Sequence, residues 1–201
     1  MLIPICLLAF VVLLYLRDNP GAAFRNYQKS LSTGNWDRVI ELSDQTTTDY
    51  LESLENWIWN GGRKDVEQLE PFQQFLVFTT RCYMIENQRA SITQEQLLGT
   101  WLNALQLDGT IRKTAVRNRY NFGEKSIGQL YLKASNRSTP LKIHFIKESK
   151  WRIQSINLLK EAYLEASLVG NDELLRSANR GYFEQGHRRE YLKPLKFQSV
   201  N

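Results

Sequence analysis

The fold is decided by residues 113 to 154, which read KTAVRNRYNFGEKSIGQLYLKASNRSTPLKIHFIKESKWRIQ. Four runs within this stretch alternate between apolar and polar side chains, and turn-forming residues separate them at 121–126, 135–140 and 148–150. Alternation is the period of a β-strand with one buried face, and connections this short join only antiparallel neighbours. The stretch therefore predicts a four-stranded antiparallel meander.

The alternation also assigns each side chain to one face of the predicted sheet. One face is apolar, with Val116, Leu130 and Ile143 along its middle. The opposite face is positively charged and also carries Tyr131 and His144. Its six cations are Lys113, Arg117, Arg119, Lys133, Lys142 and Arg152. We expect the apolar face to pack against helices and the cationic face to meet solvent or a partner.

Apolar residues recur at helical spacing before the strands, from residue 22 to residue 107, and again after them from Leu158 to about Arg180. The sequence therefore predicts an α+β fold. In it, N-terminal helices pack on one face of the four-stranded antiparallel meander sheet, a C-terminal helix follows, and an apolar helix precedes everything at the N-terminus.

Several boundaries of the helical half are visible in the sequence. Gly34 stands where a glycine ends a helix, and Thr93 with Gln96 is typical of a capping box at a helix start. Pro71 either kinks a helix or begins a new one. We expect Asp108-Gly109 to close the helical half.

The N-terminal residues indicate a segment that inserts into a membrane. Residues 2–16 read LIPICLLAFVVLLYL, an uncharged run shorter than the roughly 20 residues that span a bilayer. We predict a membrane anchor or signal segment at 1–18, an α+β domain at 19–180 and a basic C-terminal tail at 181–201. We expect the domain to be exported, and so extracytoplasmic or periplasmic. A cytoplasmic domain and a cleaved segment stay open as alternatives.

Charge is divided unevenly along the chain. Residues 21–110 hold seven Lys or Arg against twelve Asp or Glu, whereas residues 111–160 hold twelve against two. The cationic sheet face has two interpretations: a solvated face that resists edge aggregation, or a docking surface for an anionic partner. Nucleic acid is the partner favoured least, because only Tyr131 offers a stacking ring among the cations.

The inner face suggests a second kind of site. Asn118 and Tyr120 fall among its apolar residues, and with Trp57 and Trp101 they would line a pocket. Alternatively, Tyr120 only packs its ring at the sheet margin. No nucleophile–base motif, phosphate-binding loop or metal-ligand spacing is present. The sequence therefore predicts no catalytic residue, no metal site and no cofactor.

The opening AFRNYQKSLSTGNWDRVIELS at 23–43, the following TTTDYLESL at 46–54 and the ending HFIKESKWRIQSI at 144–156 resemble nuclear-transport-factor-two-like (cystatin-like) domains. The resemblance covers about residues 22 to 157 and implies that fold. The stretch from Asp65 to Leu107 is longer than in the minimal version. Enzymes of the family, ketosteroid isomerases and dehydratases, use pocket Asp, Tyr or His residues, and only Tyr120 matches such a role here.

These observations lead to an expected function. We expect a membrane-tethered, extracytoplasmic, non-enzymatic binding or assembly domain, held to the membrane through residues 2–16 and paired with a protein partner or with itself. The layout is similar to that of bacterial envelope proteins, including inner-membrane assembly factors of type IV secretion systems. The alternative is a small-molecule-binding or isomerase/dehydratase-like enzyme that uses a sheet–helix pocket.

Overall fold

The computed structural model describes residues 18–87, 89 and 91–168. The predicted anchor at 2–16 and the predicted tail at 181–201 lie outside these residues. The helices are α2 (Pro20–Thr33), α3 (Trp36–Leu42), α4 (Gln45–Trp59), α5 (Arg63–Val66), α6 (Pro71–Glu86), α7 (Gln94–Ala104), α8 (Leu107–Arg112) and α9 (Ser155–Leu168). The strands are β1 (Thr114–Phe122), β2 (Lys125–Leu132), β3 (Ser138–Lys147) and β4 (Trp151–Ile153).

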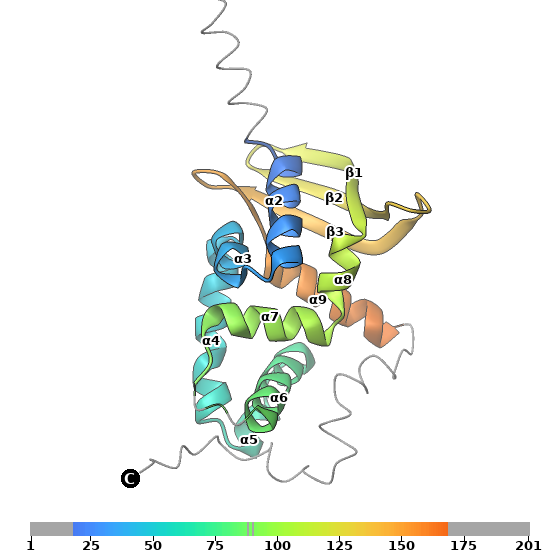
Figure 1. The fold of residues 1–201 in the computed structure, drawn as a ribbon. Coiled ribbons are helices and arrows are strands. Elements are labelled where there is room, and N and C mark those ends of the chain that lie inside the picture. The colour runs from blue at the N-terminus through green and yellow to red at the C-terminus, as the bar shows by residue number, and fades with distance from the viewer. Residues whose placement is uncertain (1–17, 88, 90, 169–201) are drawn as a thin grey trace, which may run out of the picture.

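The strands form one antiparallel sheet in the order β1-β2-β3-β4, which confirms the predicted meander. Helix α2 crosses one face of this sheet (Figure 1), and α9 follows β4 as the expected C-terminal helix. The α+β class is therefore confirmed for the described part of the chain. No helix in that part is both long and apolar enough to cross a membrane.

The helix boundaries follow local chemistry. The Asn19 side chain accepts the Ala22 N–H at the start of α2, and Gly34 ends that helix at φ 64°, a left-handed conformation that glycine adopts without strain. Pro71 begins a new helix, α6, and does not kink an older one. The capping box of Thr93 and Gln96 opens α7, as the sequence predicts.

The expectation that Asp108-Gly109 closes the helical half is wrong. Both residues lie inside α8, a helix that the sequence pattern does not predict. Leu107 and Ile111 of α8 are buried in the core. Their burial outweighs the helix penalty of Gly109, because glycine in a helix is less stable than alanine by about 1 kcal/mol.

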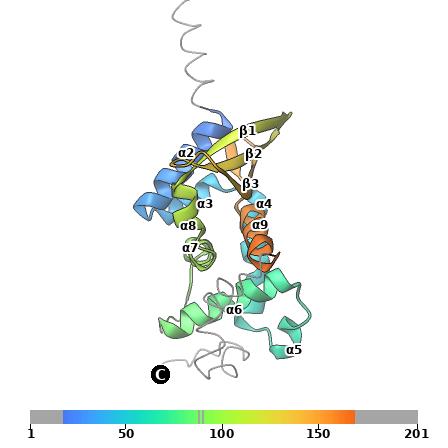
Figure 2. The same ribbon diagram turned by 90° about the vertical axis from the view of Figure 1, so that its right-hand side faces the viewer.

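Below the sheet, the helices build a second half of the core. Figure 2 shows α5 and α6 farthest from the sheet, with α4 and α7 between them and the strands. Trp101 of α7 is fully buried, and its indole N–H donates to the Thr80 hydroxyl of α6 at 2.9 Å. From the sheet side, Leu130, Ile143 and Phe145 enter the same core.

Helix α9 protects the edge of β3 that the three-residue β4 leaves open. The carboxylate of Glu161 accepts the backbone N–H of Lys142 at 2.7 Å, and its other oxygen lies 2.9 Å from Nε2 of His144. An exposed strand edge invites pairing with other chains. His144, predicted to face outward, is half-buried because Glu161 of α9 lies against it.

The predicted alternation fails inside β1. Between the pairs Arg117–Gln129 and Tyr120–Ile127, β1 advances by three residues while β2 advances by two. The extra residue forms a β-bulge, in which Asn118 takes the left-handed φ of 49°. Because strand side chains alternate with a period of two, every β1 residue beyond the bulge changes face.

Candidate functional site: the open face of the sheet

The candidate site is the sheet face opposite α2, which we call the open face. In Figure 2, α2 and α3 lie to one side of the sheet and the other helices below it. The centre of the open face is the row Arg117–Gln129–Lys142, whose backbones are direct neighbours on β1, β2 and β3. Arg117 and Lys142 are exposed there, as predicted.

Neighbouring side chains hold the Arg117 end of this row in place. The Arg117 guanidinium carbon lies 5.8 Å from the centre of the Tyr131 ring, within the range of a cation–π contact. The Tyr131 hydroxyl in turn accepts the side-chain N–H of Asn118 at 2.8 Å. Tyr131 thus positions a cation while Arg117 keeps its N–H groups free to point outward.

Lys113 and Lys133 lie together at one end of the open face. The backbone N–H of Lys133 donates to the Lys113 carbonyl at 2.9 Å, so the two residues are neighbours just after the end of β2 and just before the start of β1. The Lys133 ammonium also donates to the Arg112 carbonyl at 3.1 Å, at the C-terminus of α8. Both side chains remain exposed.

Arg152 is paired with other groups of the protein. Its Nε lies 2.9 Å from a carboxylate oxygen of Glu148, and Nη1 donates to the Glu41 carbonyl at the end of α3. A cation at a helix C-terminus is favourable because the terminal carbonyls carry partial negative charge. Arg152 therefore joins β4 to α3 and offers less charge to a partner than Arg117 or Lys142.

The predicted place of Arg119 on the cationic face is wrong. A Cβ built on Gly21 of α2 would lie 3.1 Å from Nη1 of Arg119, and one built on Gly128 would lie 3.3 Å from its Cγ. Gly128 lies between Ile127 and Gln129, so it faces the helix side. The bulge has moved Arg119 to that side, under the start of α2.

The predicted pocket of Asn118, Tyr120, Trp57 and Trp101 is not assembled. Asn118 is exposed within the bulge, and Tyr120 is 64% exposed opposite Ile127 on the open face. Trp101 is fully buried between helices, while Trp57 is half-buried near the end of α4. The Trp57 carbonyl binds Arg81 of α6 and the Trp101 indole binds Thr80 of the same helix, so both tryptophans lie in the helical layers and not beside the end of β1.

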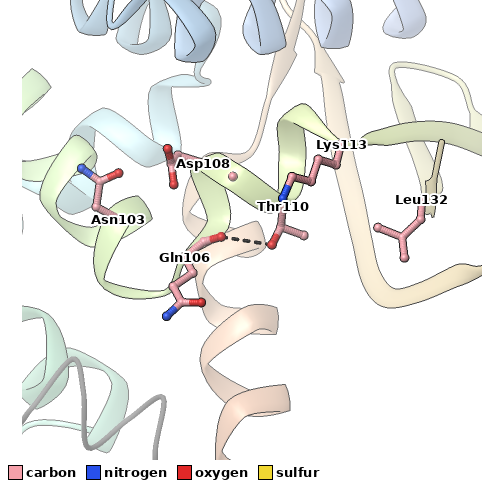
Figure 3. A pocket seen from close by; sticks show the side chains of 7 residues that line it. Asn103, Gln106, Asp108, Thr110, Lys113 and Leu132 are labelled. Carbon is pink, nitrogen blue, oxygen red and sulfur yellow. Dashed lines mark hydrogen bonds between the residues drawn. The ribbon is translucent and has the colours of Figure 1, made fainter. Parts of the chain in front are cut away.

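A pocket does exist at the junction of α7, α8 and β2, where the sequence predicts none. It has a volume of about 400 Å³, and Figure 3 shows the side chains around it. The lining residues are Asn103, Gln106, Asp108, Gly109, Thr110, Lys113 and Leu132.

Two polar side chains of this pocket make local contacts. The Thr110 hydroxyl donates to the Gln106 carbonyl at 3.0 Å, and Asp108 pairs with Arg112 at 2.8 Å (Figure 3 shows the first contact). The lining contains no cysteine or histidine, and its Thr110 hydroxyl and Asp108 carboxylate take part in the two contacts just described. Within the described ranges, no group of three His, Cys, Asp or Glu residues could hold a metal ion.

Comparisons of the chain with protein-family models, with curated proteins and with solved structures found no match. The resemblance to nuclear-transport-factor-two-like domains therefore stays a prediction.

Proposed function

We propose that this chain is a membrane-tethered binding domain that docks an anionic partner on the open face of its sheet, outside the cytoplasm. The observation that carries the proposal is the row Arg117–Gln129–Lys142, where two exposed cations flank an amide on the sheet face opposite α2. Carboxylate or phosphate groups are the natural ligands for such a row.

The surrounding charge supports an anionic partner. The segment that builds the sheet, residues 111–160, holds twelve Lys or Arg and two Asp or Glu, and one of those acids, Glu148, is paired with Arg152. The helical part, residues 21–110, has the opposite balance. A surface divided in this way attracts an acidic partner toward the sheet and orients it during the encounter.

The docking part can be tested by charge reversal with a matched control. The probe is fluorescent poly-L-glutamate, and binding is followed by anisotropy at 50 and 200 mM salt. Arg117→Glu with Lys142→Glu should weaken binding about tenfold or more, which is about 1.4 kcal/mol. The control is Lys29→Glu with Lys64→Glu, which changes net charge equally at two exposed helical sites.

The control separates a local surface from overall charge. If both double variants lose affinity equally, the probe senses only net charge and the open face is not the docking site. If neither variant changes affinity, the docking proposal fails.

The membrane part is supported by the uncharged run at 2–16. A reporter enzyme fused to the C-terminus, active on only one side of the membrane, tests its topology. Activity on the extracytoplasmic side agrees with the proposal, and activity in the cytoplasm contradicts it.

A further inference from the structure

The end of β1, beside the β1–β2 turn, exposes two aromatic rings two residues apart. Tyr120 and Phe122 are each 64% exposed, an unusual amount for side chains of this size. Tyr120 pairs with Ile127, and Phe122 pairs with Lys125 on β2. Because of the β1 bulge, both rings belong to the open face and not to the core.

The chain enters the domain at the same end. Asp18 is tied to the β3–β4 hairpin: its carboxylate accepts the backbone N–H of Trp151 at 3.3 Å and binds the Lys147 ammonium. The backbone N–H of Lys147 donates to the Glu124 carbonyl in the β1–β2 turn at 2.6 Å. Figures 1 and 2 both place the start of α2 and this turn at one end of the molecule.

The tie at Asp18 is charge-assisted. Partial burial works to raise the pKa of Asp18, but the Lys147 hydrogen bond and the Trp151 N–H outweigh it and hold the pKa below its ordinary value. Asp18 is therefore ionised at neutral pH. Two residues before it, at Leu16, the uncharged run ends.

The charges beside the two rings have the sign that an anionic membrane attracts. Lys125 lies on the strand next to Phe122, and Lys150 is exposed in the nearby β3–β4 turn. Aromatic rings beside lysines are typical of the membrane interface, where rings enter the headgroup region and ammonium groups meet phosphates.

We propose that the β1–β2 turn rests on the membrane, with Tyr120 and Phe122 in the headgroup region and Lys125 against lipid phosphates. The inference rests on the membrane attachment in the proposed function and is independent of the Arg117–Lys142 row. Two contacts, the entering chain and the turn, then fix how the domain stands on the membrane.

The test uses the full chain with Cys6→Ser, in vesicles of three parts phosphatidylcholine to one part phosphatidylglycerol. A fluorophore is attached at Phe122→Cys, and lipids with a nitroxide on the headgroup are the quencher. The matched control is the same label at Ser135→Cys, an exposed site in the turn at the opposite end of β2. Cys82 is buried and is left in place.

We expect at least twofold stronger quenching at Phe122→Cys than at Ser135→Cys. In the Phe122→Cys label background, Lys125→Gln should reduce the quenching. Flotation of the vesicles reports attachment separately. If the chain floats but both labels are quenched equally, the turn contact is wrong and the attachment stands.

Two other outcomes would overturn the proposed contact between the turn and the membrane. If the label at Phe122→Cys is shielded from the quencher and the unlabelled Phe122→Cys variant forms disulfide-linked dimers, a second copy covers the turn and the lipid proposal is overturned. If the chain does not float, the membrane attachment fails, and the turn contact fails with it.

Discussion

Gly128 faces the β1 bulge at a point where a side chain has no room. A Cβ built there would lie 2.3 Å from Cγ1 of Val116, far inside any normal contact. Val116 is β-branched and held on a strand, so it cannot easily rotate away. Arg119, 3.3 Å away, passes over the same spot. The missing side chain at Gly128 is therefore what lets the bulge close onto β2.

Gly128→Ala should lower the free energy of unfolding by about 1–3 kcal/mol, the usual effect of overpacking. The control is Gly109→Ala in α8, where a Cβ meets nothing within 4 Å. That change should be neutral or stabilising by up to about 1 kcal/mol. Urea unfolding measures both. Adding Val116→Ala should restore part of the stability that Gly128→Ala loses. If Gly128→Ala and the unsubstituted chain unfold at the same urea midpoint, this account is wrong.

At the scale of elements, Arg81 of α6 closes the C-terminus of α4. The side chain is fully buried. Its Nε donates to the Ile58 carbonyl at 2.9 Å, and Nη2 donates to the carbonyls of Trp57 and Gly61 at 2.6 Å each. The last carbonyls of a helix have no partner within the helix, so a buried cation satisfies both their hydrogen bonds and their partial charge. This contact joins two helices that are separated along the chain by α5.

Arg81→Met keeps most of the side-chain volume and removes the donors. We expect a loss of about 3 kcal/mol or more in unfolding free energy, because three backbone carbonyls at the end of α4 lose the donors that Arg81 provides. Arg81→Lys should lose less, since one ammonium cannot span all three carbonyls as the guanidinium fork does. The control, Arg38→Met, removes an exposed cation paired with Glu41 and should change stability by less than about 1 kcal/mol. Equal losses for Arg81→Met and Arg38→Met would refute the capping role.

At the scale of the whole molecule, buried hydroxyl groups connect the first and last described helices. The Tyr27 hydroxyl of α2 lies 3.0 Å from the Ser155 hydroxyl at the start of α9, which lies 2.7 Å from the Ser43 hydroxyl at the end of α3. The Ser43 hydroxyl donates to the Val39 carbonyl at 2.9 Å. This network brings together segments more than 100 residues apart.

The network makes stability sensitive to alkaline pH. Burial raises the pKa of Tyr27 from 10.0 to about 12, although the hydrogen bonds from Ser155 and Ser43 work to lower it. Below pH 10, the neutral phenol is present in both folded and unfolded states. As pH rises from 10 to 12, the unfolded state ionises first and is favoured, so stability falls by up to about 2–3 kcal/mol from this group.

Tyr27→Phe should remove this contribution and flatten the decline between pH 10 and 12. Urea unfolding at pH 8, 10 and 11 measures it, and the pH 8 value separately gives the loss of the hydrogen bond, about 1 kcal/mol. Tyr50, whose pKa burial also raises to about 12, remains in the variant and leaves part of the slope. An unchanged slope in Tyr27→Phe would show that Tyr27 does not carry the effect.

Local signals in the sequence account for most of the elements. Gly34, Pro71 and Thr93 mark real helix ends because capping depends on neighbours within a few residues. The four alternating runs likewise give the sheet order, since short connections leave no other topology. The α8 helix was missed because its stability comes from burying Leu107 and Ile111, which lie beside no helix signal.

The candidate site was only partly predictable. Arg117 and Lys142 precede the bulge or lie on another strand, so period-two alternation places them correctly. Arg119 lies within the bulge and Tyr120 directly follows it, so each lies on the face of the sheet opposite to the one predicted. A glycine inside a strand pattern is a known sign of a bulge, so Gly128 carried a signal that the alternation argument did not use. The α7–α8 pocket has no sequence signal, because it lies where Gln106 adopts a left-handed φ of 53°, which is uncommon for a residue other than glycine.

Periodicity and turn chemistry act between near neighbours, so the α+β class, the meander and the cations at the centre of the open face could be predicted from the amino-acid sequence. Three features come from the tertiary structure: Arg119 lies on the helix side of the sheet, Tyr120 and Phe122 stand exposed, and Asp18 brings the entering chain to their end of the sheet. These features depend on how distant segments fit against each other, and the extra β1 residue opposite Gly128 accounts for the sides taken by Arg119, Tyr120 and Phe122.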